Sequence, residues 1–263
     1  MSLNEEFQVV LLAGGLGTRI REETNNRPKP MIEIGGSPII WHLMKNFSQF
    51  GIRRFVICAG YKAEVIVDYF SNYDLRQNNF TVKLGLESTI KIHHKLKPID
   101  WEITVVHTGG PEIGTGGRLY RAAEYIDSKN FICTYGDGLS DVNVNELIDT
   151  HSLSGSTATV TVVNPTSRFG VVQIDDKNKV TTFKEKPTAE GWVNGGFFVF
   201  SSDIFNYLND SIMLEGAPMQ KLSAESKLGA YRHNGFWQAM DTFREYELLE
   251  NLWQKNIAPW KNW

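Results

Sequence analysis

Three glycines and two polar side chains follow the first apolar run of the chain, in the stretch LLAGGLGTRI at residues 11–20. Glycine tolerates positive φ angles and lets backbone N–H groups approach a phosphate closely. A loop at the carboxyl end of a strand in an α/β sheet also lies where such sheets bind ligands. The stretch therefore indicates a phosphate-binding loop, with a tight turn that holds no ligand as the alternative.

The spacing of this loop differs from two common phosphate-binding motifs. The fingerprint G-x-G-x-x-G would need a third glycine at Ile20, and a Walker loop would need a Gly-Lys-Ser/Thr ending. A basic segment, RPKP at residues 27–30, follows instead. Its two prolines fix φ and favour extended neighbours, so we predict that Lys29 is held on a stiff, strand-like segment. Lys29, Arg19 and the glycines could together enclose a triphosphate; a solvated basic loop is the alternative.

Short β-rich runs alternate with helical patterns over residues 7–140, and this alternation predicts a mostly parallel sheet flanked by helices. The strand-like runs are 7–12, 54–60, 102–107 and 131–137, and the helical ones are 38–51, 63–70 and 116–126. An inserted hairpin is expected at 80–94. The second half is expected to be richer in antiparallel strands, at 157–163, 169–174, 179–183 and 195–200, with helices near 201–209, 216–226 and 243–253.

Composition limits the possible functions. The 263 residues carry a net charge of -3, which gives no general attraction to nucleic acid or to an anionic membrane. No segment approaches the ~20 apolar residues of a membrane span, and the N-terminus lacks the features of a signal peptide, so we expect a cytoplasmic protein. Cys58 and Cys133 each lie in an apolar stretch and are expected to be buried, reduced thiols.

Several long motifs resemble those of the sugar-1-phosphate nucleotidyltransferases, and they follow one another along almost the whole chain. They are LLAGGLGTRI, NNRPKPMIEIGGSPIIWH, GYKAEVIVDYF, HTGG followed by TGGR, TYGDG, FKEKP, NGGFFVF, FWQAMDT and LWQKNIAPWKNW. The resemblance is to the cytidylyl branch of the family. It implies an enzyme that joins CTP and α-D-glucose 1-phosphate into CDP-glucose and pyrophosphate, for the deoxysugars of surface polysaccharides.

The resemblance also implies the fold and its division. We expect a Rossmann-like α/β nucleotidyltransferase fold, with a mixed, mostly parallel central sheet flanked by helices and an antiparallel-rich second half. A single domain is expected over 1–263, with a nucleotide-binding half at 7–140, a sugar-phosphate-binding half at 141–240 and a C-terminal helix and tail at 241–263.

Two aspartates match the metal-binding carboxylates of this family. Asp137 follows the apolar strand FICTY, where a strand end would point its carboxylate into the ligand cleft, and Asp241 precedes the last predicted helix. Mg²⁺ commonly uses one or two carboxylates together with phosphates. A turn aspartate at 137 and a helix N-cap at 241 are the alternatives. The resemblance favours Mg²⁺ as the cofactor at this pair.

The resemblance implies the substrate contacts as well. Arg19, Lys29 and Lys186 are expected to be catalytic, with Lys186 at the sugar phosphate. The residues expected around the nucleotide are Leu12, Gly14, Gly15, Gly17, Thr18, Arg19, Lys29, Thr108, Gly116, Arg118 and Asp137. The residues expected around the sugar phosphate are Tyr135, Glu185, Lys186, Asn194, Gly195 and Trp237.

One segment departs from the family pattern. His107 stands where an aspartate is usual, Tyr120 replaces a usual lysine, and the loop between them is one residue longer. Another nucleoside triphosphate or sugar 1-phosphate is therefore an alternative substrate. A nucleotide-sugar-binding subunit without turnover is a further alternative, but it would be expected to lack Lys29, Lys186 or the two aspartates.

The C-terminal segment is rich in large apolar side chains, because it contains Trp253, Trp260 and Trp263. Such a tail either docks on its own core or is buried against a neighbouring subunit. The oligomeric habit of the family favours a homo-oligomer, either a trimer or a hexamer. The adjacent His93 and His94 point to opposite faces of a strand, so we expect a structural or interface role and not joint binding of one metal ion.

Overall fold

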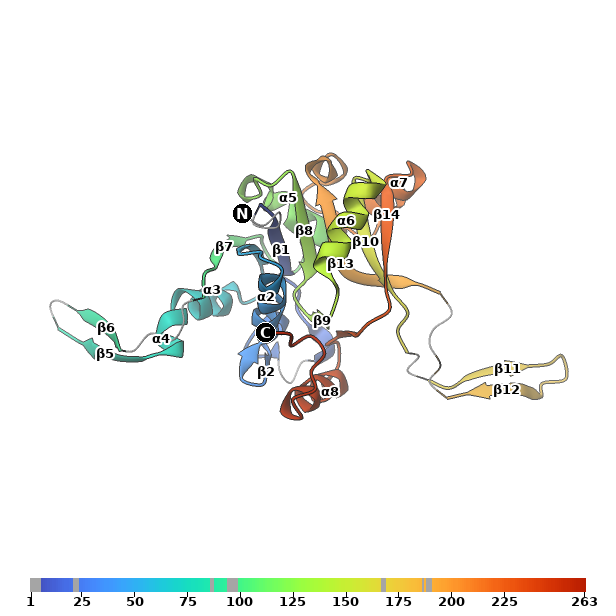
Figure 1. Ribbon diagram of the computed structural model, residues 1–263, viewed down its shortest axis with the longest axis horizontal. Coiled ribbons are helices and arrows are strands. Elements are labelled where there is room, and N and C mark those ends of the chain that lie inside the picture. The colour runs from blue at the N-terminus through green and yellow to red at the C-terminus, as the bar shows by residue number, and fades with distance from the viewer. Residues whose placement is uncertain are drawn as a thin grey trace.

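A seven-stranded sheet in the order β14-β10-β13-β8-β1-β4-β7 forms the centre of the molecule (Figure 1). The computed structural model describes residues 6–20, 24–85, 88–93, 99–166, 169–185, 187 and 191–263. The strands are β1 (Gln8–Ala13), β4 (Arg54–Ala59), β7 (Glu102–His107), β8 (Asn130–Tyr135), β10 (Ala158–Val163), β13 (Val193–Ser201) and β14 (Leu228–His233).

Strand β13 pairs antiparallel with both of its neighbours, whereas all other pairs in this sheet are parallel. The carboxyl ends of six strands and the first residues of β13 therefore meet at one edge. The predicted mixed, mostly parallel sheet is confirmed. Strand β14 is absent from the sequence-based prediction.

Helices cover both faces of the sheet. Alternate residues of β1 contribute to two separate cores, with Val9 and Leu11 in one and Val10 and Leu12 in the other. This is the pattern expected for a strand buried on both faces. The first core is closed by α2 (Ile39–Gln49), α3 (Ala63–Ser71) and α6 (Val144–Ser154). The second is closed by α5 (Thr115–Arg121), η4 (Ser202–Tyr207) and α7 (Ala217–Ala224).

Two predicted helices differ in type or length. The helix expected over 201–209 is the 3-10 helix η4. The helix expected over 116–126 is split into α5 and a 3-10 turn, η3 (Ala123–Tyr125). The backbone N–H of Ala122 is shared between the carbonyls of Arg118 and Leu119, which tightens the last turn of α5 and ends it.

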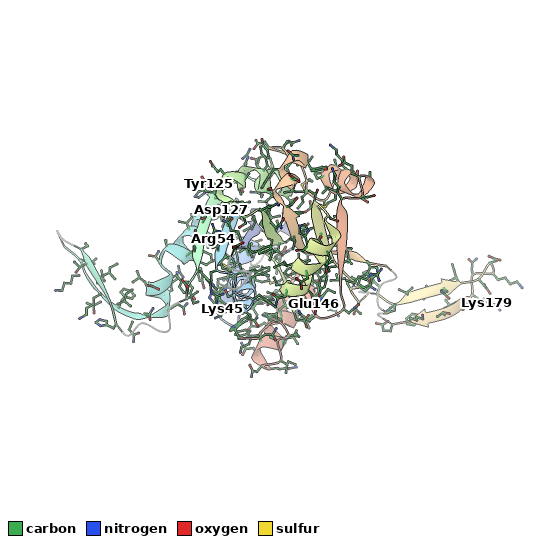
Figure 2. All side chains as sticks on the ribbon, turned by 45° about the horizontal axis from the view of Figure 1, so that its top comes forward. Lys45, Arg54, Tyr125, Asp127, Glu146 and Lys179 are labelled. Atoms are coloured by element: carbon green, nitrogen blue, oxygen red, sulfur yellow. The ribbon has the colours of Figure 1, made fainter. Side chains whose placement is uncertain are left out.

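Two hairpins project from opposite sides of the sheet (Figure 1). One is β5 (Asn79–Lys83) with β6 (Thr89–His93), which follows the short helix α4 (Tyr73–Gln77) and was expected from the sequence. The other is β11 (Val171–Ile174) with β12 (Val180–Lys184). Side chains extend from both hairpins into the surrounding space, with Lys179 at the tip of the second (Figure 2).

The C-terminal tail docks on its own chain. It follows α8 (Phe243–Gln254), and Trp260 is fully buried, with its ring stacked on Phe236 and its Nε1 donating to Nδ1 of His42 at 3.4 Å. Trp253 and Trp263 pack around the same histidine. Of the two arrangements open from the sequence, docking on the chain's own core is therefore the one observed, and this tail needs no neighbouring subunit to cover Trp260.

The two cysteines are buried and free, as expected. Burial raises the pKa of Cys58 to about 12, which keeps its thiol protonated. None of the helices within the described residues is both long and apolar enough to cross a bilayer.

Candidate active site

A cavity of about 750 Å³ opens at the sheet edge where the strand ends meet. Its wall combines the glycine loop after β1, the segments that follow β8 and β15 (Trp237–Ala239), and the start of β13. Thirteen of the predicted site residues line it: Leu12, Gly14, Gly15, Gly17, Thr18, Lys29, Arg118, Tyr135, Asp137, Asn194, Gly195, Trp237 and Asp241. The topology thus brings together residues from almost the whole length of the chain.

The glycines of the first loop differ in what they permit. A Cβ on Gly14 would lie 2.0 Å from a guanidinium nitrogen of Arg118, so this position leaves no room for a side chain. Gly17 has a φ of +62°, and a Cβ there would crowd Lys29. Gly15, by contrast, faces open space. A side chain at Gly14 would therefore displace the Arg118 guanidinium and one at Gly17 would strain the backbone, while Gly15 leaves the loop open toward the cavity.

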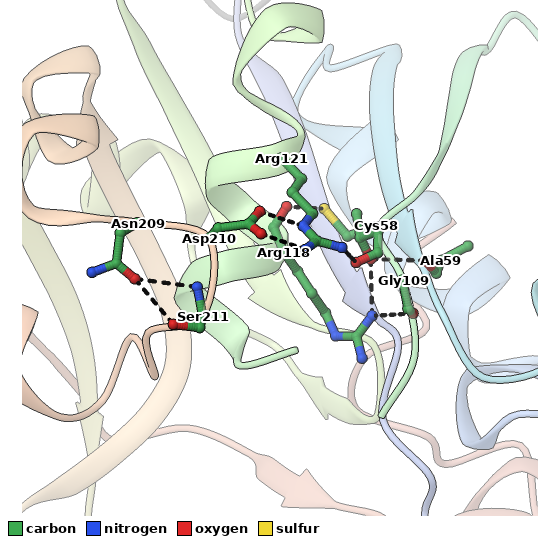
Figure 3. Close-up of polar contacts among 9 residues, drawn as sticks. Cys58, Ala59, Gly109, Arg118, Arg121, Asn209, Asp210 and Ser211 are labelled. Atoms are coloured by element: carbon green, nitrogen blue, oxygen red, sulfur yellow. Dashed lines mark hydrogen bonds and ion pairs between the residues drawn. The ribbon is translucent and has the colours of Figure 1, made fainter. Parts of the chain in front are cut away.

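Arg118 is a buried cation in the cavity wall, only 3% exposed. Its guanidinium donates to Oγ1 of Thr108 at 2.9 Å and to the carbonyl of Gly109 at 3.2 Å (Figure 3). It also donates to the carbonyl of Gly110 at 2.6 Å. Burial lowers the pKa of Arg118, although the group stays charged. Since these three acceptors are uncharged, the guanidinium positions the 108–110 loop and still offers its positive charge to an anion in the cavity.

Lys29 joins the two predicted metal-binding carboxylates. Its Nζ lies 2.6 Å from Oδ2 of Asp137 and 2.7 Å from Oδ1 of Asp241. The lysine side chain is 10% exposed, and the carboxylates are 29% and 27% exposed. Burial lowers the pKa of Lys29, but the charge of Asp137 and the hydrogen bonds to both carboxylates outweigh it, so the pKa is raised overall.

The backbone at Lys29 is a 3-10 turn and not the strand-like segment predicted. Pro28 is extended, at φ -70° and ψ 153°, but the N–H of Met31 then donates to the carbonyl of Pro28 at 2.8 Å and closes the turn η2 (Lys29–Met31). Pro30 fits because the first turn of a helix needs no N–H at that position.

A short antiparallel ribbon brings the two aspartates together. Asp137 directly precedes β9 (Gly138–Ser140), and Asp241 closely follows β15, which pairs with β9 in the register Ala239 to Gly138. The N–H of Met240 then donates to the carbonyl of Asp137 at 2.9 Å. The carboxylates therefore flank the same end of one ribbon, although the sequence separates them widely.

Asp241 is not the N-cap of the last helix, which was the alternative role for it. Thr242 is the N-cap of α8, and the carboxylate of Glu245 accepts from the N–H groups of Asp241 and Thr242 at 2.7 and 2.8 Å. This capping arrangement fixes the backbone of Asp241 and leaves its side chain directed to Lys29.

Polar groups at the other end of the cavity are linked to one another. The amide of Asn194 donates to the hydroxyl of Tyr135 at 3.3 Å, and Nε1 of Trp237 donates to the carbonyl of Gly195 at 2.7 Å. The Tyr135 hydroxyl itself donates to Glu215. Burial, and then the neighbouring carboxylate charge, raise the pKa of Tyr135, so this hydroxyl remains protonated at neutral pH.

Three predicted residues lie outside the cavity wall. Thr108 is fully buried, and its hydroxyl donates to the carbonyl of Ala59 at 2.8 Å, so it supports the wall from behind. Gly116 is buried against Ile212, and Glu185 is exposed beyond the end of β12. Lys186 and the side chain of Arg19 lie outside the described part of the chain.

The cavity also includes residues that sequence reasoning missed. Pro111, Ile113 and Met213 form an apolar lip, and Thr115 lies beside them. Met213 belongs to a loop of no recognisable pattern, and nothing in the sequence indicates its position. Thr115 is the first residue of the TGGR motif named above, and Gly114 directly precedes it, so this motif was the available signal.

The two aspartates suit a hard divalent cation. Among the described residues, no group of three or more His, Cys, Asp or Glu side chains is placed to hold a metal ion. The two carboxylates nevertheless converge on one cation, the ammonium of Lys29, at the cavity wall. Mg²⁺ often takes one or two carboxylates and completes its shell with water and phosphate oxygens. The donor set therefore fits a Mg²⁺ ion that arrives with a phosphate ligand.

Comparison with solved structures identifies the class of fold. HddC from Yersinia pseudotuberculosis matches with a TM-score of 0.67 at 24% identity, over 94% of this chain and 99% of HddC. A UDP-glucose pyrophosphorylase complexed with UDP-glucose matches with a TM-score of 0.68 at 17% identity, over 95% and 99% of the two chains. At this identity the likeness concerns the fold alone.

Sequence comparison then places the chain in a family. The profile of the family described as nucleotidyl transferase matches residues 8–243, and the chain belongs to this family. A glucose-1-phosphate cytidylyltransferase of Salmonella typhi is 46% identical over 98% of this chain and 100% of its own length. A probable glucose-1-phosphate cytidylyltransferase of Bacillus subtilis is 39% identical over 98% of this chain and 100% of its own length.

Proposed function

We propose that this protein transfers a cytidylyl group from CTP to α-D-glucose 1-phosphate and gives CDP-glucose and pyrophosphate. The names of the two similar bacterial enzymes support the substrates. The observation that carries the reaction class is the convergence of Lys29, Asp137 and Asp241 beside the glycine loop. In this reaction a phosphate oxygen of the sugar phosphate attacks the α-phosphate of CTP in line, and pyrophosphate leaves.

The chain's part in this reaction is to hold two polyanions in contact and to balance charge. Gly15 leaves the loop after β1 open to the phosphates, and Arg118 and Lys29 supply positive charge along the wall. Asp137 and Asp241 would hold Mg²⁺. The bound ion would neutralise the negative charge that develops on the leaving pyrophosphate.

The other end of the cavity suits a sugar phosphate. Tyr135, Asn194 and Trp237 offer a hydroxyl, an amide and an aromatic ring, which are groups that contact sugar hydroxyls and the faces of sugar rings. Lys186 follows β12 in sequence and is proposed to meet the phosphate of this substrate, as the family resemblance implies.

Two of the three departures from the family pattern, His107 and Tyr120, have little bearing on the wall of the cavity, whereas the longer loop between them contributes Pro111, Ile113 and Thr115 to it. His107 is exposed at the end of β7, Tyr120 is 44% exposed on α5, and both lie outside the cavity wall. This supports the proposal that they leave the choice of CTP unchanged.

The test is Mg²⁺-dependent release of pyrophosphate, with CTP, UTP, dTTP, GTP and ATP each crossed against glucose 1-phosphate and other sugar 1-phosphates. Release that is strongest with CTP and glucose 1-phosphate is the expected result. Preference for another pair would overturn the substrate assignment but leave the reaction class. Release with no pair would favour a binding subunit without turnover.

We also propose that the protein is a homo-oligomer, either a trimer or a hexamer. The two projecting hairpins carry large apolar side chains that are about half exposed or more: Phe80 and Ile90 on the first, and Ile174 and Phe183 on the second. An isolated two-stranded hairpin is marginal in water, so burial against another subunit would stabilise both. Light scattering after size-exclusion chromatography tests this, and a monomer at micromolar concentration would contradict it.

A further inference from the structure

The loop between η4 and α7, residues 209–216, lies directly against the start of α5. A Cβ on Gly114 would be 2.5 Å from the carbonyl oxygen of Ile212, and a Cβ on Gly117 would be 2.5 Å from that of Asp210. The N–H of Gly117 donates to the carbonyl of Ile212 at 2.9 Å. Because Gly114 and Gly117 have no side chain, the backbone of the loop at Asp210 and Ile212 can pack directly against the start of α5.

An ion pair holds one end of this loop. The guanidinium of Arg121, one turn along α5, donates to both carboxylate oxygens of Asp210 (Figure 3). Asn209 accepts from the N–H of Ser211 at 3.1 Å and forms a local turn (Figure 3). This two-point contact fixes the first half of the loop on the outer side of α5.

Glu215 holds the other end of the loop, and it uses both oxygens of its carboxylate. Oε2 accepts from the hydroxyl of Thr115 at 2.6 Å, and Oε1 accepts from the hydroxyl of Tyr135. The hydroxyl of Thr115 also accepts from the N–H of Leu214 at 3.0 Å. One carboxylate therefore joins the start of α5, the end of β8 and the loop itself.

The two hydroxyl groups lie in different parts of the cavity wall. Thr115 begins α5, the helix that carries Arg118, which is one of the residues proposed for the nucleotide. Tyr135 receives the amide of Asn194, at the end proposed for the sugar phosphate. A carboxylate that holds both hydroxyls determines how far apart these two walls stand. Hydrogen bonds to a charged acceptor are the stronger kind, and both bonds at Glu215 are of that kind.

We propose that Glu215 is a positioning residue that sets the separation of the nucleotide and sugar-phosphate ends of the cavity, and so the affinity for both substrates. The inference rests on the proposed function. Glu215 itself lies outside the cavity wall, so its effect passes through Thr115 and Tyr135. It is expected to act on binding, because its two hydrogen bonds go to wall residues, Thr115 and Tyr135, whereas Lys29 bonds to Asp137 and Asp241.

The test compares Glu215→Ala and Glu215→Gln with the wild type in steady-state kinetics for each substrate. Glu215→Ala is expected to raise KM for CTP and for glucose 1-phosphate about tenfold each, with kcat changed less than about threefold, since a charge-assisted hydrogen bond is lost on each side. Glu215→Gln is expected to recover much of both losses, because its amide oxygen can accept from Tyr135 and its NH₂ group can donate to the oxygen of Thr115.

Glu225→Ala is the matched control. Glu225 also accepts from a tyrosine hydroxyl, that of Tyr207 at 2.6 Å, but this pair lies outside the cavity wall. Its removal is expected to leave both KM values unchanged.

The double variant Glu215→Ala/Tyr135→Phe separates positioning from a general loss of packing. If Glu215 acts through Tyr135, the effects of the two changes on KM for glucose 1-phosphate are expected to be less than additive. Fully additive effects, unchanged KM values in Glu215→Ala, or a loss confined to kcat would each overturn the proposal. A wild type without turnover would instead overturn the proposed function. Equilibrium binding of CTP to the same variants would then test Glu215, and unchanged affinity in Glu215→Ala would overturn the proposal.

Discussion

Lys29→Met removes the only positive charge that bridges Asp137 and Asp241 in the described contacts, and it retains much of the side-chain volume. The wild-type triad has one positive and two negative charges, whereas the variant leaves two carboxylates facing each other. Removing one partner of a fully buried ion pair costs about 3–5 kcal/mol of folding stability. Because each aspartate is more than a quarter exposed, solvent screens the repulsion, and we expect a loss of about 2 kcal/mol without divalent cations.

The same substitution is expected to make stability depend on Mg²⁺. In the wild type, a divalent cation competes with the ammonium of Lys29 for both carboxylates. In the variant this competitor is gone. A cation at ten times its dissociation constant stabilises the folded state by about 1.4 kcal/mol, so 10 mM Mg²⁺ is expected to restore much of the lost stability of Lys29→Met and to change the wild type little without nucleotide.

The assay is urea unfolding at pH 7.5 with 0, 1 and 10 mM Mg²⁺ and no nucleotide. Lys83→Met, on an exposed strand of the β5–β6 hairpin, is the control for loss of a lysine in general. Mn²⁺ binding followed by electron paramagnetic resonance gives a second reading, and Lys29→Met is expected to bind more tightly than the wild type. An equal Mg²⁺ response in the wild type and in Lys29→Met would refute the reasoning, and so would weaker Mn²⁺ binding by the variant.

Three further predictions concern the site and its support. Asp137→Asn is expected to abolish pyrophosphate release while the far-ultraviolet circular dichroism and the unfolding midpoint stay close to those of the wild type; wild-type activity would contradict the metal assignment. Gly14→Ala is expected to displace Arg118 and weaken CTP binding about tenfold or more in calorimetry, whereas Gly15→Ala, in open space, changes it little. Burial lowers the pKa of His42 from 6.5 to about 4, so the unfolded chain binds a proton between these values that the folded chain does not. Stability is therefore expected to fall by about 3 kcal/mol as the pH falls through this window, measured by urea unfolding against a His42→Gln variant, which lacks this dependence.

Local patterns predicted the parts of the site that lie next to a strand end. The glycine loop after β1 and Asp137 after β8 each follow a buried apolar run, so the sequence alone places them at the ligand edge of an α/β sheet. Asp241 was found through a family motif, because its own neighbourhood is also that of a helix start. Its approach to Asp137 depends on the pairing of β9 with β15, which are three residues each and too short to show a period.

Other parts of the site depend on long-range packing that one sequence does not encode locally. Gly116 of the TGGR motif is expected near the nucleotide, yet it is buried against Ile212, and the N–H of the next residue, Gly117, donates to the carbonyl of Ile212. A loop such as 209–216 has no periodicity, so its contact with α5 through Glu215 and its contribution of Met213 to the cavity follow only from the fold. The surface on which the C-terminal tail docks could not be predicted for the same reason. A tryptophan is expected to be buried, but the sequence around it does not specify which surface buries it.

The tail and the carboxylate pair are connected through α2. His42 receives the indole N–H of Trp260 on one turn of this helix, and on the next turn Asn46 donates to the carbonyl of Ser140 at 2.7 Å. Ser140 belongs to β9, whose other end carries Asp137. A change that loosens the packing of Trp260 around His42 therefore acts on the helix that supports the ribbon, and the ribbon sets the approach of the two carboxylates. Protonation of His42 would disturb the same packing, because its Nδ1 would then carry a proton and could no longer accept the hydrogen bond from the indole N–H of Trp260. A continuous chain of contacts thus leads from Trp260 through His42 and Asn46 of α2 to the ribbon that carries Asp137 at its end.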